Sequence, residues 1–199
     1  MLTDRLARQI DFLVQADRLK TIIRRTPLTD NSRLENSAEH SWHLALAALA
    51  LREHAPADVD LARVLELVTV HDLVEIDAGD TFAYDHDPAI HRTKADRERV
   101  AADRIFGLLP PDQMVRFRAL WDEFEAHATL EARFANALDR LQALLQNVQS
   151  GGGSWAVHHV TRGQVLDRMA PVHSALPDLW PFVLDVIDRA CDSGAIVRD

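Results

Sequence analysis

Apolar side chains recur mostly every three or four residues along the chain, which is the spacing of helices packed against a core. From residue 6 to residue 23 this pattern predicts one amphipathic helix, which should end before Thr26-Pro27 because a proline disfavours helical geometry in the preceding residue. A second helix is expected from Asn36 to about His54, with Asn36 as its cap and Glu39 at the capping-box position. Because that helix is nearly all apolar after Trp42, we expect it to be central.

The same spacing predicts four more helices before a run of glycines. They cover residues 59–74, 94–109 and 111–126 and a segment that begins after Thr129. Between the first two of these, residues 79–88 are rich in Gly, Asp and Pro and predict an irregular loop. Asp85 and Asp87 in this loop are expected to be solvated turn formers.

The run Gly151-Gly152-Gly153-Ser154 predicts a flexible linker. Two more helices are expected after it, from about Thr161 and from near Pro177. Residues 151–199 are too few to form a stable domain alone, so we expect a C-terminal extension that packs on the same core. The predicted fold is therefore all-α, with residues 1–199 in a single domain.

Charge and composition exclude several classes of protein. A formal net charge of −9 argues against general affinity for nucleic acid, whose phosphates need a basic surface. The longest apolar run, 44–51, is far shorter than the ~20 residues of a membrane span. The first twenty residues do not resemble a signal peptide, and the lone Cys191, expected to be a partly buried thiol, suits a reducing compartment. A cytoplasmic protein is expected, without a membrane or nucleic-acid partner.

The doublet His71-Asp72 ends an apolar helical run and supplies two adjacent side chains of the metal-binding type. Neighbouring side chains on a helix diverge by about 100°, so both can bind one ion only at the edge of the helix. Other parts of the chain must then complete the site. His40 upstream and Asp139 downstream are the candidates.

Both candidates also have an ordinary structural interpretation. A single histidine on an apolar helix face is more often a hydrogen-bonded core residue than a ligand, and His43, three residues after His40, keeps that interpretation. Asp139 lies beside an apolar stripe, and a buried Asp needs a partner. The partner is either Arg140 or Arg133, or a metal ion.

Two arginines, Arg24 and Arg25, precede the polar loop before His40. Such a pair is usually a solvated charge pair. Its position shortly before the first candidate ligand also fits a phosphate contact, because guanidinium matches phosphate bidentately.

Taken together, Glu39-His40, His71-Asp72 followed by Glu75 and Gly79-Asp80, and Leu138-Asp139 resemble the HD-domain metal-dependent phosphohydrolases. The similarity extends over roughly residues 15 to 147 and is greater to their 5′-deoxynucleotidase-like subgroup. It implies an HD-type helical bundle that forms homodimers, with a metal site between the central helices. It also implies one divalent ion held by His40, His71, Asp72 and Asp139.

Two imidazoles and two carboxylates suit a borderline divalent ion. A tetrahedral Zn²⁺ would have no open position, whereas octahedral Mn²⁺, Co²⁺ or Fe²⁺ keeps two positions for a water and a phosphate oxygen. Those three ions are therefore favoured, with Mg²⁺ and Zn²⁺ as possibilities. The resemblance implies that Glu75 and Asp80 act as acid and base, in an order that spacing does not decide, and that Arg25 clamps the phosphate.

One position departs from the family pattern. The bacterial deoxynucleotidases have tryptophan between the arginine and the proline, where this chain has Thr26, and the bulky ring is thought to exclude ribose. The expected activity is therefore hydrolysis of nucleoside 5′-monophosphates, both deoxyribo- and ribonucleotides, by metal-activated water. The expected partner is this small phosphate monoester.

Two alternatives stay open. A dinuclear HD-type oxygenase would need extra ligands between the doublet and Asp139, and His86, His91 and His127 are available without a convincing pattern. A non-catalytic ligand-binding protein on the same fold is the other alternative. The presence of Glu75 and Asp80 argues against it, because a binding module needs neither.

Overall fold

The computed structural model describes residues 3–84 and 88–199, apart from the side chains of residues 88–92. The six longer helices that precede the glycine run, together with short α4, are α1 (Asp4–Ala16), α2 (Ser37–Ala50), α3 (Leu61–Val70), α4 (Glu75–Ala78), α5 (Pro88–Phe106), α6 (Pro111–Ala126) and α7 (Leu130–Gln149). The C-terminal helices are α8 (Gly153–His158), α9 (Arg162–Arg168), α10 (Ala170–Ala175) and α11 (Trp180–Asp192). The described residues are thus mostly helical, as predicted.

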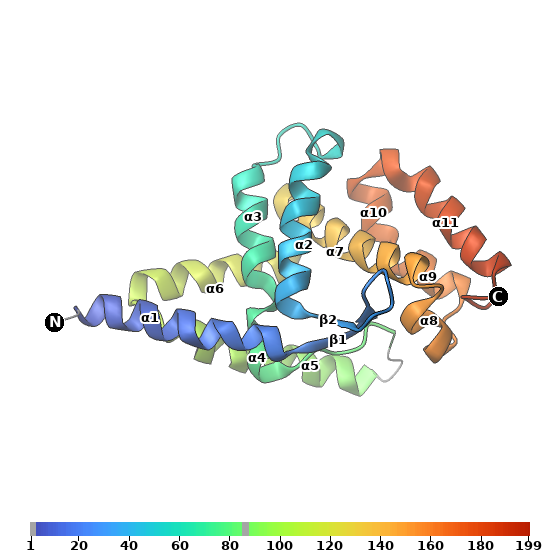
Figure 1. Cartoon of the computed structure of the whole chain (residues 1–199). Coiled ribbons are helices and arrows are strands. Elements are labelled where there is room, and N and C mark those ends of the chain that lie inside the picture. The colour runs from blue at the N-terminus through green and yellow to red at the C-terminus, as the bar shows by residue number, and fades with distance from the viewer. Residues whose placement is uncertain (1–2, 85–87) are drawn as a thin grey trace.

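Helices α2, α3 and α7 pack against one another at the centre of the molecule. Their facing apolar side chains, among them Leu44, Leu67 and Leu138, are completely buried. Figure 1 shows α5 and α6 beside this central group, α1 extending along them, and α8–α11 gathered at the other end of α7. Arg8 fixes α1 in place by donating to the carbonyls of residues 107–109, which end the turn after α5.

A small antiparallel sheet replaces the end of the predicted first helix. Helix α1 ends at Ala16, a 3-10 turn follows at Asp17–Thr21, and strand β1 (Ile23–Pro27) pairs with β2 (Leu34–Asn36). The prediction of one helix to residue 23 was wrong because pairing with β2 outweighs the local apolar spacing. The strand alternation leaves Arg24 partly buried and Arg25 exposed.

Helix ends follow the local chemistry of the sequence in most places. Asn36 and Glu39 form the predicted capping box of α2, and Thr129 accepts from the Ala132 amide at the start of α7. Helix α5 instead begins at Pro88, six residues before the predicted start, where the fixed φ of proline suits a first helical position. The helix predicted over 59–74 is divided into α3 and a 3-10 turn, η3 (His71–Val74).

The glycine run is a tight turn and not the flexible linker that composition predicted. The amide and hydroxyl of Ser154 both donate to Asn147 Oδ1, at 2.8 and 2.9 Å. A Cβ atom at Gly153 would lie 2.7 Å from the same oxygen, so this position requires glycine. The turn leads into α8, and Trp155 and Met169 beyond it are 1% exposed and join the apolar core.

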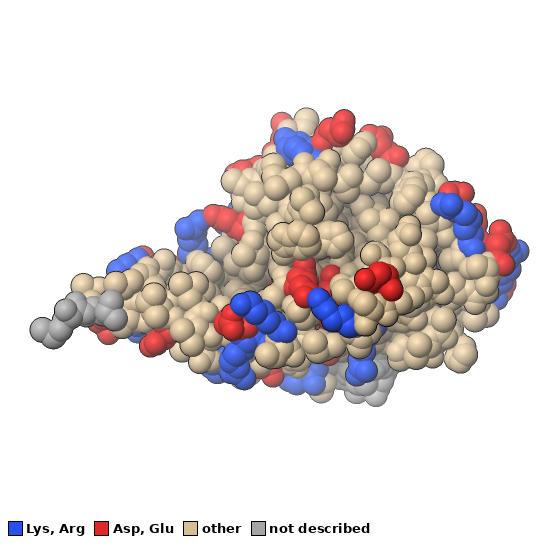
Figure 2. Space-filling model, viewed as in Figure 1, with Lys and Arg blue, Asp and Glu red and all other residues tan. Residues whose placement is uncertain are grey.

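The C-terminal segment forms four helices where two were predicted, and α10 and α11 pack on α7. Cys191 in α11 is a buried free thiol, as expected. None of the helices in the described ranges combines the length and the apolar character needed to cross a membrane. On the face shown in Figure 2, basic side chains are interspersed with acidic ones and form no continuous basic surface.

Candidate metal centre

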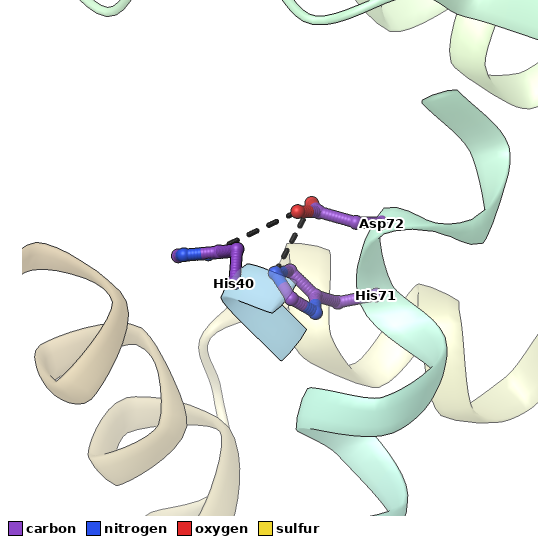
Figure 3. Close-up of side chains that lie close together, drawn as sticks. All are labelled: His40, His71 and Asp72. Atoms are coloured by element: carbon purple, nitrogen blue, oxygen red, sulfur yellow. Dashed lines mark ion pairs between the residues drawn. The ribbon is translucent and has the colours of Figure 1, made fainter. Parts of the chain in front are cut away.

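Helix α2 and the turn at the end of α3 bring the first three candidate ligands together. His40 lies in the first turns of α2, and His71 and Asp72 lie in η3 at the end of α3. Figure 3 shows Asp72 linked by dashed lines to both histidines, and each of the three side chains offers a ligand atom within 4.8 Å of the others. Asp72 is between the rings, with Oδ1 3.1 Å from His71 Nε2 and Oδ2 3.8 Å from His40 Nε2.

Asp139 approaches the same place from α7. Its Oδ1 atom lies 3.1 Å from His40 Nε2, and its Oδ2 atom accepts from Arg140 at 2.9 Å. Among the described residues, the tightest ligand group contains His40, His71 and Asp72 without Asp139. Asp139 therefore has the arginine partner that one interpretation of its sequence predicted, Arg140, and it also lies beside the candidate ligand His40.

The two imidazoles have the hydrogen bonding expected of metal ligands. His71 Nδ1 lies 2.9 Å from the Val68 carbonyl, and His40 Nδ1 lies 3.1 Å from Gln142 Oε1. Donation from Nδ1–H leaves a lone pair on Nε2. Both Nε2 atoms are buried and form no hydrogen bond of acceptable geometry within residues 3–84 and 88–199, although a carboxylate oxygen lies 3.1 Å from each of them. Two such lone pairs facing one carboxylate fit a divalent cation.

The charges around His40 favour a cation at this place. Burial and Arg24 lower the pKa of His40, but Asp139, Glu35 and Asp72 outweigh them and raise it to about 9. Despite burial, Arg140, His40 and Arg24 hold the pKa of Asp139 well below its ordinary value. A proton on His40 Nε2 and a metal ion would occupy the same place, so metal binding would release that proton.

Two more carboxyl groups adjoin the candidate ligands. Glu75 in α4 is 5% exposed and accepts from Ser37 Oγ at 2.6 Å. Burial first, and then Asp72, raise the pKa of Glu75 to about 8. Burial also raises the pKa of Asp80, which lines the same pocket as Glu75 and Asp139. Carboxyl groups with raised pKa values beside ionised ones are typical of acid and base pairs in hydrolases.

Of the adjacent arginines Arg24 and Arg25, it is Arg24 whose side chain lies among the candidate metal ligands. The sequence alone did not single it out. Its guanidinium contacts Asp72 Oδ2 at 3.1 Å, Glu35 Oε2 at 3.4 Å and Asp139 Oδ1 at 4.0 Å. Arg25 and Thr26 line the pocket beside this cluster, and Arg25 is exposed. Strand alternation would have separated the two arginines, but the sequence predicted the start of a loop there and no strand.

A second, acidic cavity adjoins the centre and contains residues that the sequence did not single out. Lys94 and Glu98, an ion pair at 3.3 Å, line it together with Glu125 and His71. His127 also lines this cavity, yet within the described part of the chain it joins no group of metal ligands. His86 and the side chain of His91, the other histidines considered for a second metal, lie outside the described residues, as do Asp85 and Asp87.

Comparisons with known proteins agree with this geometry. The sequence model of a family described as an HD domain matches residues 16–180. The chain is 30% identical to human 5′-deoxynucleotidase HDDC2 over 139 residues, which cover 67% of this chain and 66%, just under two thirds, of that protein. It is 28% identical to the 5′-deoxynucleotidase yfbR of Photorhabdus temperata over 178 residues, which cover 86% of this chain and 89% of that protein.

Among solved structures, a predicted metal-dependent phosphohydrolase from Magnetospirillum magnetotacticum MS-1 is 47% identical, with a TM-score of 0.93 over 98% of this chain and 99% of that one. An HD-domain phosphohydrolase from Listeria innocua, at 16% identity and a TM-score of 0.66 over 94% of this chain and 95% of that one, shares the fold. The chain therefore belongs to the HD-domain phosphohydrolases and is related to the 5′-deoxynucleotidases at about 30% identity.

Proposed function

We propose that this protein is a metal-dependent phosphomonoesterase that hydrolyses nucleoside 5′-monophosphates. The observation that carries the proposal is the pair of unpartnered, buried imidazole nitrogens of His40 and His71 that face Asp72. The names of two relatives, both 5′-deoxynucleotidases, support a nucleotide as substrate. The pocket beside the cluster contains both the carboxyl groups and the arginines that such a reaction uses.

His40, His71, Asp72 and Asp139 would hold one divalent ion, with octahedral Mn²⁺, Co²⁺ or Fe²⁺ favoured because they leave room for water and substrate. When bound, the ion would lower the pKa of a water molecule and offset charge that develops on the phosphoryl group. Arg24 helps to keep Asp139 ionised, and its guanidinium also contacts Asp72 Oδ2 at 3.1 Å.

Glu75 and Asp80 would move the protons. One accepts a proton from the attacking water, and the other donates a proton to the ester oxygen that leaves. Ser37 fixes the orientation of Glu75 by a 2.6 Å hydrogen bond. Arg25 would contact the phosphate from the exposed side of the pocket, and Thr26 would leave space for a ribose 2′-hydroxyl. On this basis ribonucleotides are accepted together with deoxyribonucleotides.

Phosphate release from ribo- and deoxyribonucleoside 5′-monophosphates, measured with Mn²⁺, Co²⁺, Mg²⁺ and Zn²⁺, tests the proposal. Glu75→Gln and Asp80→Asn should keep the metal and turn over slowly. Asp77→Asn is the matched control, because Asp77 lies in the same helix as Glu75 but pairs with Arg104. Absence of phosphate release with every nucleotide and ion, or full turnover in both test variants, would contradict the proposal.

A further inference from the structure

The C-terminal extension supplies part of the wall of the pocket beside the candidate metal centre. Arg168, the last residue of α9, lines this pocket and also the adjoining acidic cavity. Asp72, Asp139 and Arg140 line the same two cavities. Arg168 therefore lies where the two cavities meet, next to the candidate ligands, although it is about thirty residues beyond Asp139, the last of them in sequence.

The guanidinium of Arg168 has no carboxylate of the described residues at ion-pair distance, although Asp139 and Tyr84 attract it from further away. Arg140 is paired with Asp139 at 2.9 Å, whereas no hydrogen bond or ion pair joins Arg168 to any part of the chain that the structure describes. Burial first, and then the neighbouring Arg140, lower the pKa of Arg168 to about 10. A partly buried cation without a partner destabilises a fold, so such a side chain is typical of a site that a ligand completes.

The charges that line the pocket point to an anion as that ligand. Its five basic side chains are Arg24, Arg25, Lys94, Arg140 and Arg168, against four acidic ones, Asp72, Glu75, Asp80 and Asp139. A chain with a net charge of −9 thus has an excess of positive charge at this one pocket.

We propose that Arg168, with Arg140 beside it, binds the phosphate group of the substrate. The inference rests on the proposed function and adds to it a phosphate-binding residue from the C-terminal extension. A phosphate monoester is a dianion whose oxygens match the paired N–H groups of guanidinium, and two arginines can share it. The substrate phosphate would then remove the unpaired charge that the free pocket carries.

Titration calorimetry with inorganic phosphate, with and without Mn²⁺, tests this inference without turnover. Arg168→Gln should weaken phosphate binding by about tenfold or more, because a hydrogen-bonded charge pair is lost, and Arg168→Lys should weaken it less. Arg162→Gln is the matched control: Arg162 lies in the same helix but pairs with Asp188 at 2.9 Å, away from the pocket. Its phosphate affinity should equal that of the wild type.

Thermal unfolding without phosphate separates a binding role from a structural one. Arg168→Gln should unfold at the wild-type temperature or above it, because it removes an unpaired charge. A lower unfolding temperature, equal phosphate affinity in Arg168→Gln and wild type, or no phosphate binding by the wild type would each overturn the inference. Phosphate binding that depends on Arg168, without hydrolysis of any nucleotide, would support this site and refute only the proposed function.

Discussion

Gln142 is expected to set the affinity of the site for metal without being a ligand. Its side-chain amide donates to Glu35 Oε1 at 2.8 Å, and a carboxylate can only accept. The amide oxygen must therefore face His40 Nδ1, 3.1 Å away, and His40 must donate from that nitrogen. This hydrogen bond keeps the lone pair of His40 on Nε2, toward Asp72 and Asp139.

Gln142→Leu removes the nearest acceptor and leaves His40 Nδ1 with only Glu35 Oε2, 3.6 Å away, so the tautomer and orientation of the ring are held less firmly. Loss of such a supporting hydrogen bond typically lowers metal affinity by about 10- to 100-fold, or about 1.4 to 2.7 kcal/mol. Titration calorimetry with Mn²⁺, or competition with a chelator of known affinity, measures this change. The cost in the free energy of unfolding should be about 1 kcal/mol, since Glu35 keeps a second donor.

Gln146, the second residue that donates to Glu35, provides the control. Gln146 lies one turn further along α7, is equally buried, and donates to the same Glu35 oxygen at 2.8 Å. Gln146→Leu should therefore reduce stability to a similar extent while metal affinity stays at the wild-type value. If both variants bind Mn²⁺ equally well, His40 does not depend on Gln142 and the reasoning is refuted.

Three other predictions concern pH, helix capping and the sugar. In the metal-free protein the pKa of Glu75 is raised from 4.5 to about 8, so the free energy of unfolding should fall as the pH rises through that range. The pKa of His40, raised to about 9, acts in the same direction, so Glu75→Gln should make this dependence shallower in denaturant titrations without abolishing it. Asn36→Ala removes the capping box and should lower the free energy of unfolding by about 1 kcal/mol; an unchanged denaturation midpoint would contradict this. Thr26→Trp should lower turnover of ribonucleotides relative to deoxyribonucleotides, and an unchanged ratio would mean that residue 26 does not sense the sugar.

The sequence predicted those features that depend on local chemistry. The capping box of α2, the N-cap Thr129 of α7, the prolines at the start of α6 and the helical spacing identified these three helices, because residues within one turn determine such helix ends. The candidate ligands were identified by residue type and by the family resemblance, and the structure brings His40, His71 and Asp72 together. The homodimer and the cytoplasmic location stay predictions.

Features that depend on distant contacts were not predictable in this way. Strand β1 exists because β2 pairs with it, so the inward direction of Arg24 followed only from the structure. The glycine run is ordered because Asn147 binds the turn, and composition alone does not reveal such a partner. Arg168 had no motif to mark it, and only the packing of the C-terminal helices on α7 brings it beside Asp139.

A crystal structure of the protein grown with Mn²⁺, with the ion located by its anomalous scattering, tests the central claim most directly. One ion is expected at about 2 Å from Nε2 of His40, Nε2 of His71 and an oxygen of Asp72, with Asp139 as the fourth protein ligand. Asp72→Ala should show no ion and no phosphatase activity. An ion bound elsewhere, or a wild-type cluster that stays without metal at saturating Mn²⁺, would contradict the account.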